Sequence, residues 1–110
     1  MRVCKLDQIL PSTGVCVLVD GHQVAVFRVD GEVYAIDNLD PFSKANVLSR
    51  GIVGDLKGEL VVASPVYKQH FSLKTGQCLE DAEVRVATYP ACIEDGYVVV
   101  NSRAARALLS

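Results

Sequence analysis

Valine recurs at every second position along several short stretches of this chain. The alternation runs through Val15, Val17 and Val19, and it resumes at Val24 and Val26. Eighteen of the 110 residues are valine, whereas only one is methionine. Side chains branched at Cβ favour the pleated surface of a sheet, and a period of two places one face of each strand on a core. The pattern therefore predicts a fold built from short β-strands.

Pairs of Asp and Gly separate the alternating stretches. Asp20-Gly21 and Asp30-Gly31 each lie between two strand-like segments. Because a type I′ turn needs positive φ at both central residues, an Asp-Gly pair in this position predicts a β-hairpin. We expect strands near residues 2–6, 14–19, 23–29, 32–37, 60–64, 69–73, 83–88 and 97–101. Seven or eight short strands joined in this way are typical of an antiparallel β-sandwich or small barrel.

The least strand-like internal part of the sequence is residues 38–57, which we expect to form a long loop. Pro41 lies in this segment, and Ser43–Leu48 is expected to form a short helical turn within it. A second helical turn is expected at Leu6–Leu10, where Asp7 is a suitable N-cap.

The length and net charge of the chain limit the classes of protein to which it can belong. A chain of 110 residues fits one domain, which we place at residues 1–102, followed by a C-terminal tail at 103–110. A formal net charge of −2 with 22% charged residues argues against a nucleic-acid-binding module and against a disordered chain. No apolar run approaches the ~18–20 residues that span a bilayer, and the N-terminus has no apolar signal segment. We therefore expect a cytoplasmic protein without membrane contact.

Four cysteines and two histidines are a suitable inventory for a metal site, but their spacing argues against one. No two cysteines form a C-x-x-C pair and no histidine lies within four residues of a cysteine; the cysteines are Cys4, Cys16, Cys78 and Cys92. Zinc and iron–sulfur sites usually take ligands in close pairs, because one tight turn aims two side chains at the metal. We expect no metal site. Cys16 and Cys92 have apolar neighbours and are expected to be buried, whereas Cys78 follows a turn and is expected to be exposed.

The two histidines have no partner that the sequence identifies. His22 follows the Asp20-Gly21 turn, and His70 precedes Phe71 at the start of an expected strand. Both are expected to be exposed to solvent.

Two segments resemble the cluster-binding loops of Rieske [2Fe–2S] ferredoxin domains; they are Ala35–Gly51 and Val62–Gly76. Those domains carry Cys-Pro-His and then a leucine and a glycine in the first loop, and Cys-Pro-x-His and then Phe, Leu and Thr-Gly in the second. The matching positions here are Pro41, Leu48 and Gly51 in the first segment and Pro65, Phe71, Leu73, Thr75 and Gly76 in the second. The resemblance implies a Rieske-like all-β fold over most of residues 2–101, with two hairpins like the cluster loops.

The four ligand positions depart from this pattern. Asp40 and Phe42 stand where the first loop has Cys and His, and Ser64 and Tyr67 stand at the corresponding positions of the second. A Rieske centre needs two thiolates on one iron and two imidazoles on the other. Phe42 has no donor atom at all. The resemblance therefore implies a Rieske-like domain that has lost its cluster and that binds no cofactor.

Longer stretches are similar to the small subunit of assimilatory NADH-dependent nitrite reductase; they are Ile36–Phe42, Val47–Ile52, Gly58–Phe71, Cys4–Cys16 and Cys78–Asp81. In that family the large subunit holds FAD, an iron–sulfur cluster and siroheme, and it reduces nitrite to ammonium with electrons from NADH. The resemblance implies a small subunit of this oxidoreductase, active in nitrate assimilation, that supports the large subunit and has no catalytic residues of its own. In agreement, the sequence has no G-x-G-x-x-G dinucleotide fingerprint.

The resemblance also indicates where the large subunit binds. In a cluster-bearing Rieske domain, redox partners dock at the tip formed by the two loops. Here that tip offers the aromatic residues Phe42 and Tyr67, which are typical interface anchors, together with Lys68 and Arg50. The alternative is that the two rings turn inward and fill the volume of the lost cluster, while Arg50 holds its own loop.

Two other functions stay open at this point. A Rieske-type ferredoxin component of an oxygenase would contain iron and absorb visible light. A free-standing β-domain that recognises an unrelated protein would have no siroheme-type reductase encoded beside it.

Overall fold

The structure is a computed structural model that describes residues 2–101, so the tail expected at residues 103–110 lies outside the described residues. The elements, in chain order, are β1 (Arg2–Lys5), the 3₁₀ turn η1 (Leu6–Gln8), β2 (Thr13–Val19), β3 (His22–Val29), β4 (Glu32–Asp37), the 3₁₀ turn η2 (Leu48–Arg50), β5 (Ile52–Leu56), β6 (Glu59–Ala63), β7 (His70–Ser72), β8 (Thr88–Tyr89), β9 (Ala91–Glu94) and β10 (Tyr97–Val100). They form three antiparallel sheets, ordered β1-β10-β9, β2-β3-β4-β8 and β5-β6-β7. The all-β antiparallel prediction is confirmed, although the sheets of residues 2–101 do not close into a barrel.

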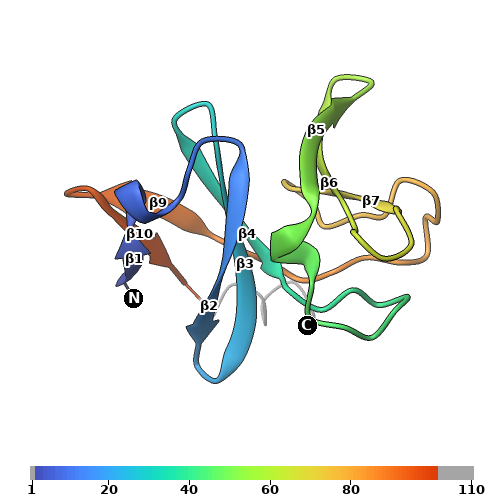
Figure 1. Cartoon of the computed structure of the whole chain (residues 1–110), viewed down its shortest axis with the longest axis horizontal. Coiled ribbons are helices and arrows are strands. Elements are labelled where there is room, and N and C mark those ends of the chain that lie inside the picture. Colours follow the sequence, from blue (N-terminus) through green and yellow to red (C-terminus); the bar gives the residue numbers. More distant parts are fainter. Residues whose placement is uncertain (1, 102–110) are drawn as a thin grey trace.

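The β2-β3-β4-β8 sheet lies between the other two sheets (Figure 1). Along β3, Ala25 and Phe27 face a core cluster that includes Phe71 of β7. Val24 and Val26 face a second cluster on the opposite side, which includes residues of β10. Because both faces of this sheet are covered, the sequence of β3 is nearly continuously apolar and does not alternate between apolar and polar residues.

Two-residue turns close four hairpins and fix their register. The predicted Asp20-Gly21 and Asp30-Gly31 turns are confirmed, with φ of 51° and 80° in the first and 49° and 80° in the second. Lys57-Gly58 closes β5 on β6 and Asp95-Gly96 closes β9 on β10 in the same way. Positive φ at both central residues is the type I′ geometry that matches the twist of the flanking strands.

Several predicted elements are wrong. The expected loop over 38–57 contains β5, which the sequence does not predict because Gly54 and Asp55 are residue types that are uncommon in strands. The helical turn expected at Ser43–Leu48 forms instead at Leu48–Arg50. The strand expected over 83–88 contributes only Thr88 to a strand, because most of this segment folds back along residues 76–78.

The expected burial of three cysteines is reversed. Cys78 is buried, because its main-chain N–H bonds the carbonyl of Val84 and its side chain enters the cluster around Phe71. Cys16 and Cys92 are exposed, because alternate residues of β2 and β9 turn toward the core and leave both thiols on the outer face. The helical turn expected near Leu6 is confirmed as η1, although Asp7 lies inside it and not at its N-cap.

Candidate functional site

The two loops that resemble cluster loops contain six-residue turns of one kind, residues 40–45 and 64–69, which together we call the tip. In each turn the N–H of the first residue donates to the carbonyl of the sixth, at 2.8 Å in the first turn and 2.9 Å in the second. The N–H of the fifth residue donates back to the carbonyl of the first, at 2.8 and 3.1 Å. The fifth residues, Lys44 and Lys68, have φ of 64° and 67°. A third turn of the same pattern, residues 72–77, has Gly76 at this position, with φ of 77°.

The first residue of each turn is buried and uses its side chain to hold the turn. Asp40 Oδ1 accepts the N–H of Phe42 at 2.9 Å, and Ser64 Oγ accepts the N–H of Val66 at 3.3 Å. Ser72 Oγ accepts the N–H of Lys74 at 3.3 Å in the third turn. These short side-chain to main-chain bonds are why Asp and Ser suit a turn of this kind.

The two turns of the tip are joined directly at the positions where the resemblance places two thiolates. Ser64 Oγ donates a hydrogen bond to Asp40 Oδ2 at 2.5 Å, and both side chains are completely buried. Asp40 Oδ1 accepts a bond within its own turn, whereas Asp40 Oδ2 accepts its hydrogen bond from Ser64 of the facing loop. A buried, charge-assisted bond of this kind stabilises the contact between the loops.

The two positions where the resemblance places imidazoles have opposite surroundings. Phe42 is half-buried against the main core, and its ring centroid lies 6.2 Å from that of Phe71 at an angle of 46°. Tyr67 is 58% exposed. The Phe42 ring therefore packs inward, as expected if it fills the volume of the lost cluster, whereas the Tyr67 ring faces solvent.

These residues do not fit a [2Fe–2S] cluster. Phe42 has no lone pair to give to iron, and the carboxylate and hydroxyl of Asp40 and Ser64 bond each other. Within residues 2–101 no group of three or more His, Cys, Asp or Glu side chains is arranged to hold a metal ion.

The surface of the tip combines apolar and cationic groups. Val66 and Tyr67 are exposed on the second turn, and Leu39, just before the first turn, is 41% exposed. Lys44 and Lys68 are exposed beside them, and Arg50 is exposed on η2, which follows the first turn. The structure therefore brings Tyr67 and Lys68 to one surface, whereas Phe42 lies behind it.

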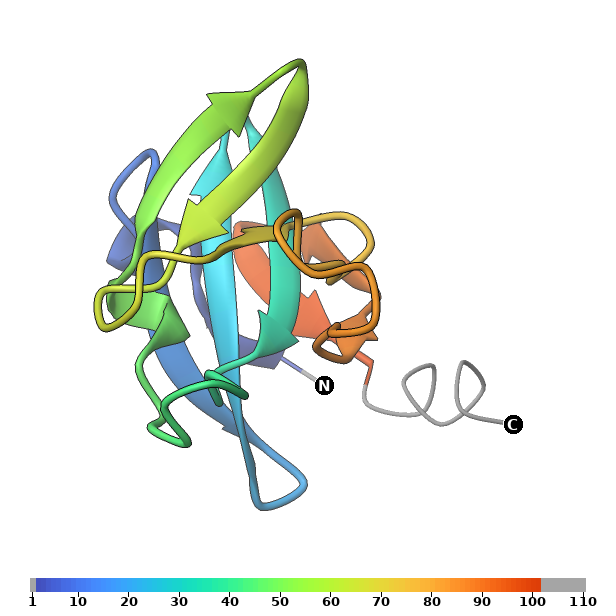
Figure 2. The ribbon, with the colours of Figure 1, turned by 90° about the vertical axis from the view of Figure 1, so that its right-hand side faces the viewer.

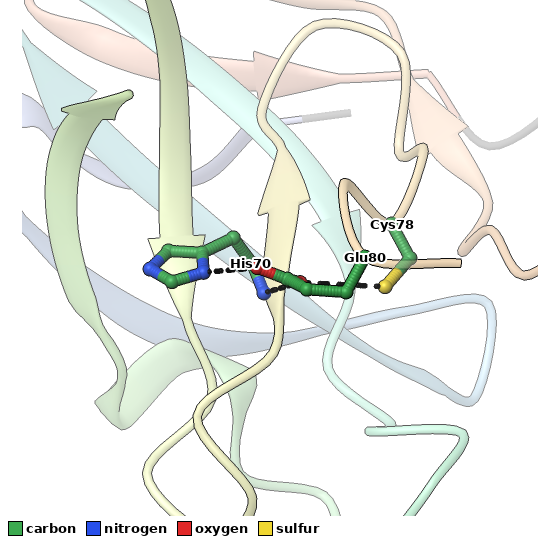
Figure 3. Close-up of polar contacts among 3 residues, drawn as sticks. All are labelled: His70, Cys78 and Glu80. Carbon is green, nitrogen blue, oxygen red and sulfur yellow. Dashed lines mark hydrogen bonds and ion pairs between the residues drawn. The ribbon is translucent and has the colours of Figure 1, made fainter. Parts of the chain in front are cut away.

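His70, expected to be exposed, is half-buried in a polar contact that the sequence does not indicate (Figure 3). Glu80 Oε2 lies 2.6 Å from His70 Nδ1, and Glu80 Oε1 accepts the main-chain N–H of His70 at 2.7 Å. Cys78 Sγ donates to the same Oε1 at 3.7 Å. Burial alone raises the pKa of Glu80, but the hydrogen bonds from His70 outweigh it and lower that pKa. Burial raises the pKa of the Cys78 thiol.

The fold and the two loops define a Rieske-type β-domain whose loops lack the Rieske ligand set. Comparison with known proteins agrees on the fold. A family model described as a Rieske-like [2Fe-2S] domain matches residues 1–101. The nitrite reductase (NADH) small subunit of Salmonella typhimurium is 52% identical over 99 residues, which cover 88% of this chain and 92% of that protein. The solution structure of the nitrite reductase NAD(P)H small subunit from Erwinia carotovora is 55% identical, with a TM-score of 0.78, and the match covers 91% of this chain and 78% of that one. This chain belongs to the Rieske-like family and, within it, to the small subunits of NADH nitrite reductase.

Two further matches separate the functions that the sequence leaves open. The nitrite reductase NAD(P)H large subunit of Klebsiella oxytoca contains a segment 43% identical over 101 residues, covering 92% of this chain but 11% of that protein. The ferredoxin of carbazole 1,9a-dioxygenase from Nocardioides aromaticivorans has the same fold, with a TM-score of 0.79, but is only 29% identical, over 91% of this chain and 94% of that one. The nitrite reductase interpretation is therefore favoured over the ferredoxin. No helix among the described residues is long and apolar enough to cross a membrane.

Proposed function

We propose that this chain is a cytoplasmic, non-catalytic small subunit of an NADH-dependent nitrite reductase and that it binds the large subunit without carrying electrons itself. The observation that carries the proposal is the hydrogen bond between Ser64 and Asp40, which occupies the positions that thiolates would need. On this proposal FAD, the iron–sulfur cluster and siroheme all belong to the large subunit, which reduces nitrite to ammonium.

The Klebsiella oxytoca match supports a close association with the large subunit. In that protein a segment similar to nearly all of this chain is part of the polypeptide named as the large subunit. Two segments that are joined in one chain stay at a high effective concentration. A separate small subunit would replace that covalent link with an interface.

We infer that the tip forms this interface, with Tyr67 as its anchor. Tyr67 is the exposed ring of the tip, and tyrosines in such positions often carry much of the binding energy. Lys68 beside it would pair with an acidic group of the large subunit, and Arg50 would extend the contact. Phe42 supports the surface from behind through its contact with Phe71.

The test of the function is reconstitution of NADH-dependent nitrite reduction by the large subunit, with and without this chain. Activity that requires or increases with the chain supports the proposal, and unchanged activity contradicts it. The isolated chain should be colourless, so visible absorption with bound iron would contradict the absence of a redox centre.

The interface is tested separately by capture of the large subunit. Tyr67→Ala and Lys68→Glu should weaken capture, whereas Leu10→Ser should not. Leu10 is a matched control because it is 70% exposed and follows Ile9, whose carbonyl accepts a hydrogen bond from Arg28 at the opposite end of β3 from the tip. Equal capture by all variants would place the interface elsewhere.

A further inference from the structure

The outer side of β2 is a sheet edge that the function proposed above does not use. In the sheet ordered β2-β3-β4-β8, β2 pairs only with β3. Figure 2 shows β2 and β4 on opposite sides of β3. Two apolar or sulfur-containing side chains of this strand face solvent, because Cys16 is exposed and Leu18 is 68% exposed.

Three residues of β2 direct their main-chain groups outward along this edge. The two-residue turn after β2 closes its hairpin at the pair Val19–His22, so Val19 and every second residue before it bond β3. The N–H and carbonyl groups of the residues between them therefore point away from β3; these residues are Gly14, Cys16 and Leu18. Among residues 2–101 none of these main-chain groups has a hydrogen-bond partner. The edge is therefore able to pair with an added antiparallel strand.

No other edge strand of the described sheets is both as long as β2 and without charge. Edge strands usually avoid pairing with another chain because they are very short, carry charged residues or contain irregularities. β1 carries Arg2 and Lys5 and pairs with an irregular register. Asp55 lies in β5 and Glu94 in β9, whereas β7 has only three residues and β8 only two. β2 has seven residues, Thr13–Val19, of which none is charged or proline, so none of these protections applies to it.

The sequence of β2 is complementary to itself in the antiparallel direction. Its middle residue is Cys16, so two copies related by a two-fold axis at Cys16 overlap along the whole strand. Gly14 of one copy then lies opposite Leu18 of the other, so neither leucine meets a side chain directly across from it. On the other face Val15 lies opposite Val17, a pair of β-branched residues that suits neighbouring strands. Because β2 carries no charge, no like charges oppose each other in this arrangement.

We propose that this edge binds a second copy of the chain, with the two β2 strands antiparallel and Cys16 facing its equivalent. The outward main-chain groups of the two strands then form about six hydrogen bonds. The two four-stranded sheets become one continuous sheet across the dimer. One shared edge buries less than the roughly 1,200–2,000 Å² of a standard interface, so we expect a weak dimer with a Kd of about 100 μM.

Sedimentation of the full chain under reducing conditions, from about 10 μM to about 1 mM, measures this association. Cys16→Lys and Cys16→Glu each place like charges opposite one another and should weaken it by about tenfold or more. An equimolar mixture of the two variants should recover it, because lysine then faces glutamate. Ile52→Lys is the matched control, since Ile52 is 75% exposed on β5, an edge strand of another sheet, and this variant should associate like the unmodified chain.

A thiol crosslinker gives a second measurement that needs no variant. A short bismaleimide should link Cys16 to Cys16 of the second copy in preference to any link that includes Cys92, which is also exposed. Equal yields of the two kinds of link overturn the proposal, because they indicate random collisions.

Three results of the sedimentation experiment also overturn the proposal. The first is an unmodified chain that stays monomeric over the whole concentration range. The second is a mixture of the charged variants that fails to associate, because Cys16 would then not face its equivalent. The third is a monomeric chain whose capture of the large subunit is weakened by Cys16→Lys, because the edge would then bind that subunit and not a second copy.

Discussion

Ser64 and Asp40 lie 24 residues apart in the sequence, yet Ser64 Oγ donates to Asp40 Oδ2 at 2.5 Å in the buried centre of the tip. Each side chain also caps its own turn, so the one bond links two separately stabilised loops. The tip is therefore held together by a hydrogen bond where a cluster-bearing domain would use metal ligands.

Removing the hydroxyl of Ser64 tests this link. Ser64→Ala leaves Asp40 Oδ2 buried without its donor, which should lower the free energy of unfolding by about 1–3 kcal/mol. Ser43→Ala is the matched control, because the Ser43 hydroxyl is only half-buried and caps a single N–H at 3.3 Å. Urea titrations of both variants measure the difference. Equal losses would mean that the bond between the loops contributes nothing beyond ordinary turn capping.

Substitution of the two aromatic residues of the tip should distinguish an effect on folding stability from an effect on binding of the large subunit. Phe42→Ala removes a ring packed against Phe71 and should cost about 2 kcal/mol or more of folding stability. Tyr67→Ala removes a mostly exposed ring and should change stability by less than about 0.5 kcal/mol. If Tyr67 anchors the large subunit, its loss should weaken binding by about 2 kcal/mol, measured by calorimetry. A large loss of stability in Tyr67→Ala would contradict this division.

Local signals in the sequence were sufficient for the β2–β3 and β3–β4 hairpins, but not for the β5–β6 and β9–β10 hairpins or for side-chain burial. The Asp20-Gly21 and Asp30-Gly31 turns depend only on the conformations their own residues can adopt. Whether Cys16 or Cys92 faces inward depends on which side of its strand another sheet covers, and the sequence does not carry that information locally. Cys78 is buried because a later segment folds back over it.

The candidate site likewise has some features that the sequence predicts and others that depend on the three-dimensional fold. The replacement of cluster ligands at Asp40 and Ser64 can be read from residue types and motif spacing alone. Their mutual hydrogen bond depends on the facing of two loops in space. The contact of Glu80 with His70 joins two exposed-looking polar residues ten positions apart, and no spacing rule for strands or helices indicates it.

Gly76 is the turn glycine whose replacement should cost most. Its φ is +77°, and an added Cβ would lie 2.1 Å from the carbonyl oxygen of Val86. Gly96 has a similar φ of +78° but open space around it. Gly96→Ala should therefore cost about 1–2 kcal/mol for the left-handed backbone alone, and Gly76→Ala at least about 1–3 kcal/mol more for the overlap. Thermal unfolding of both variants checks this, and equal shifts of Tm would contradict it.

The contact between Glu80 and His70 should give a pH-dependent contribution to stability. Although burial alone raises the pKa of Glu80, the bonds from the main chain and ring of His70 hold it below the ordinary value of 4.5. A carboxyl whose pKa is lower in the folded chain stabilises the fold above its unfolded pKa and loses that effect as pH falls through the folded value. Glu80→Gln should therefore destabilise the protein at pH 6, and the difference from the unmodified chain should shrink as the pH falls below 4.5.

Urea titrations at pH 6, 5, 4 and 3 measure this difference. Glu83→Gln is the control, because Glu83 is exposed and should give a small difference at every pH. A destabilisation by Glu80→Gln that stays constant from pH 6 to pH 3 would mean that the charge of Glu80 is not what stabilises the contact, since glutamine keeps the shape of the side chain and only one acceptor oxygen. A difference confined to the higher pH values would instead assign the effect to the carboxylate that His70 faces.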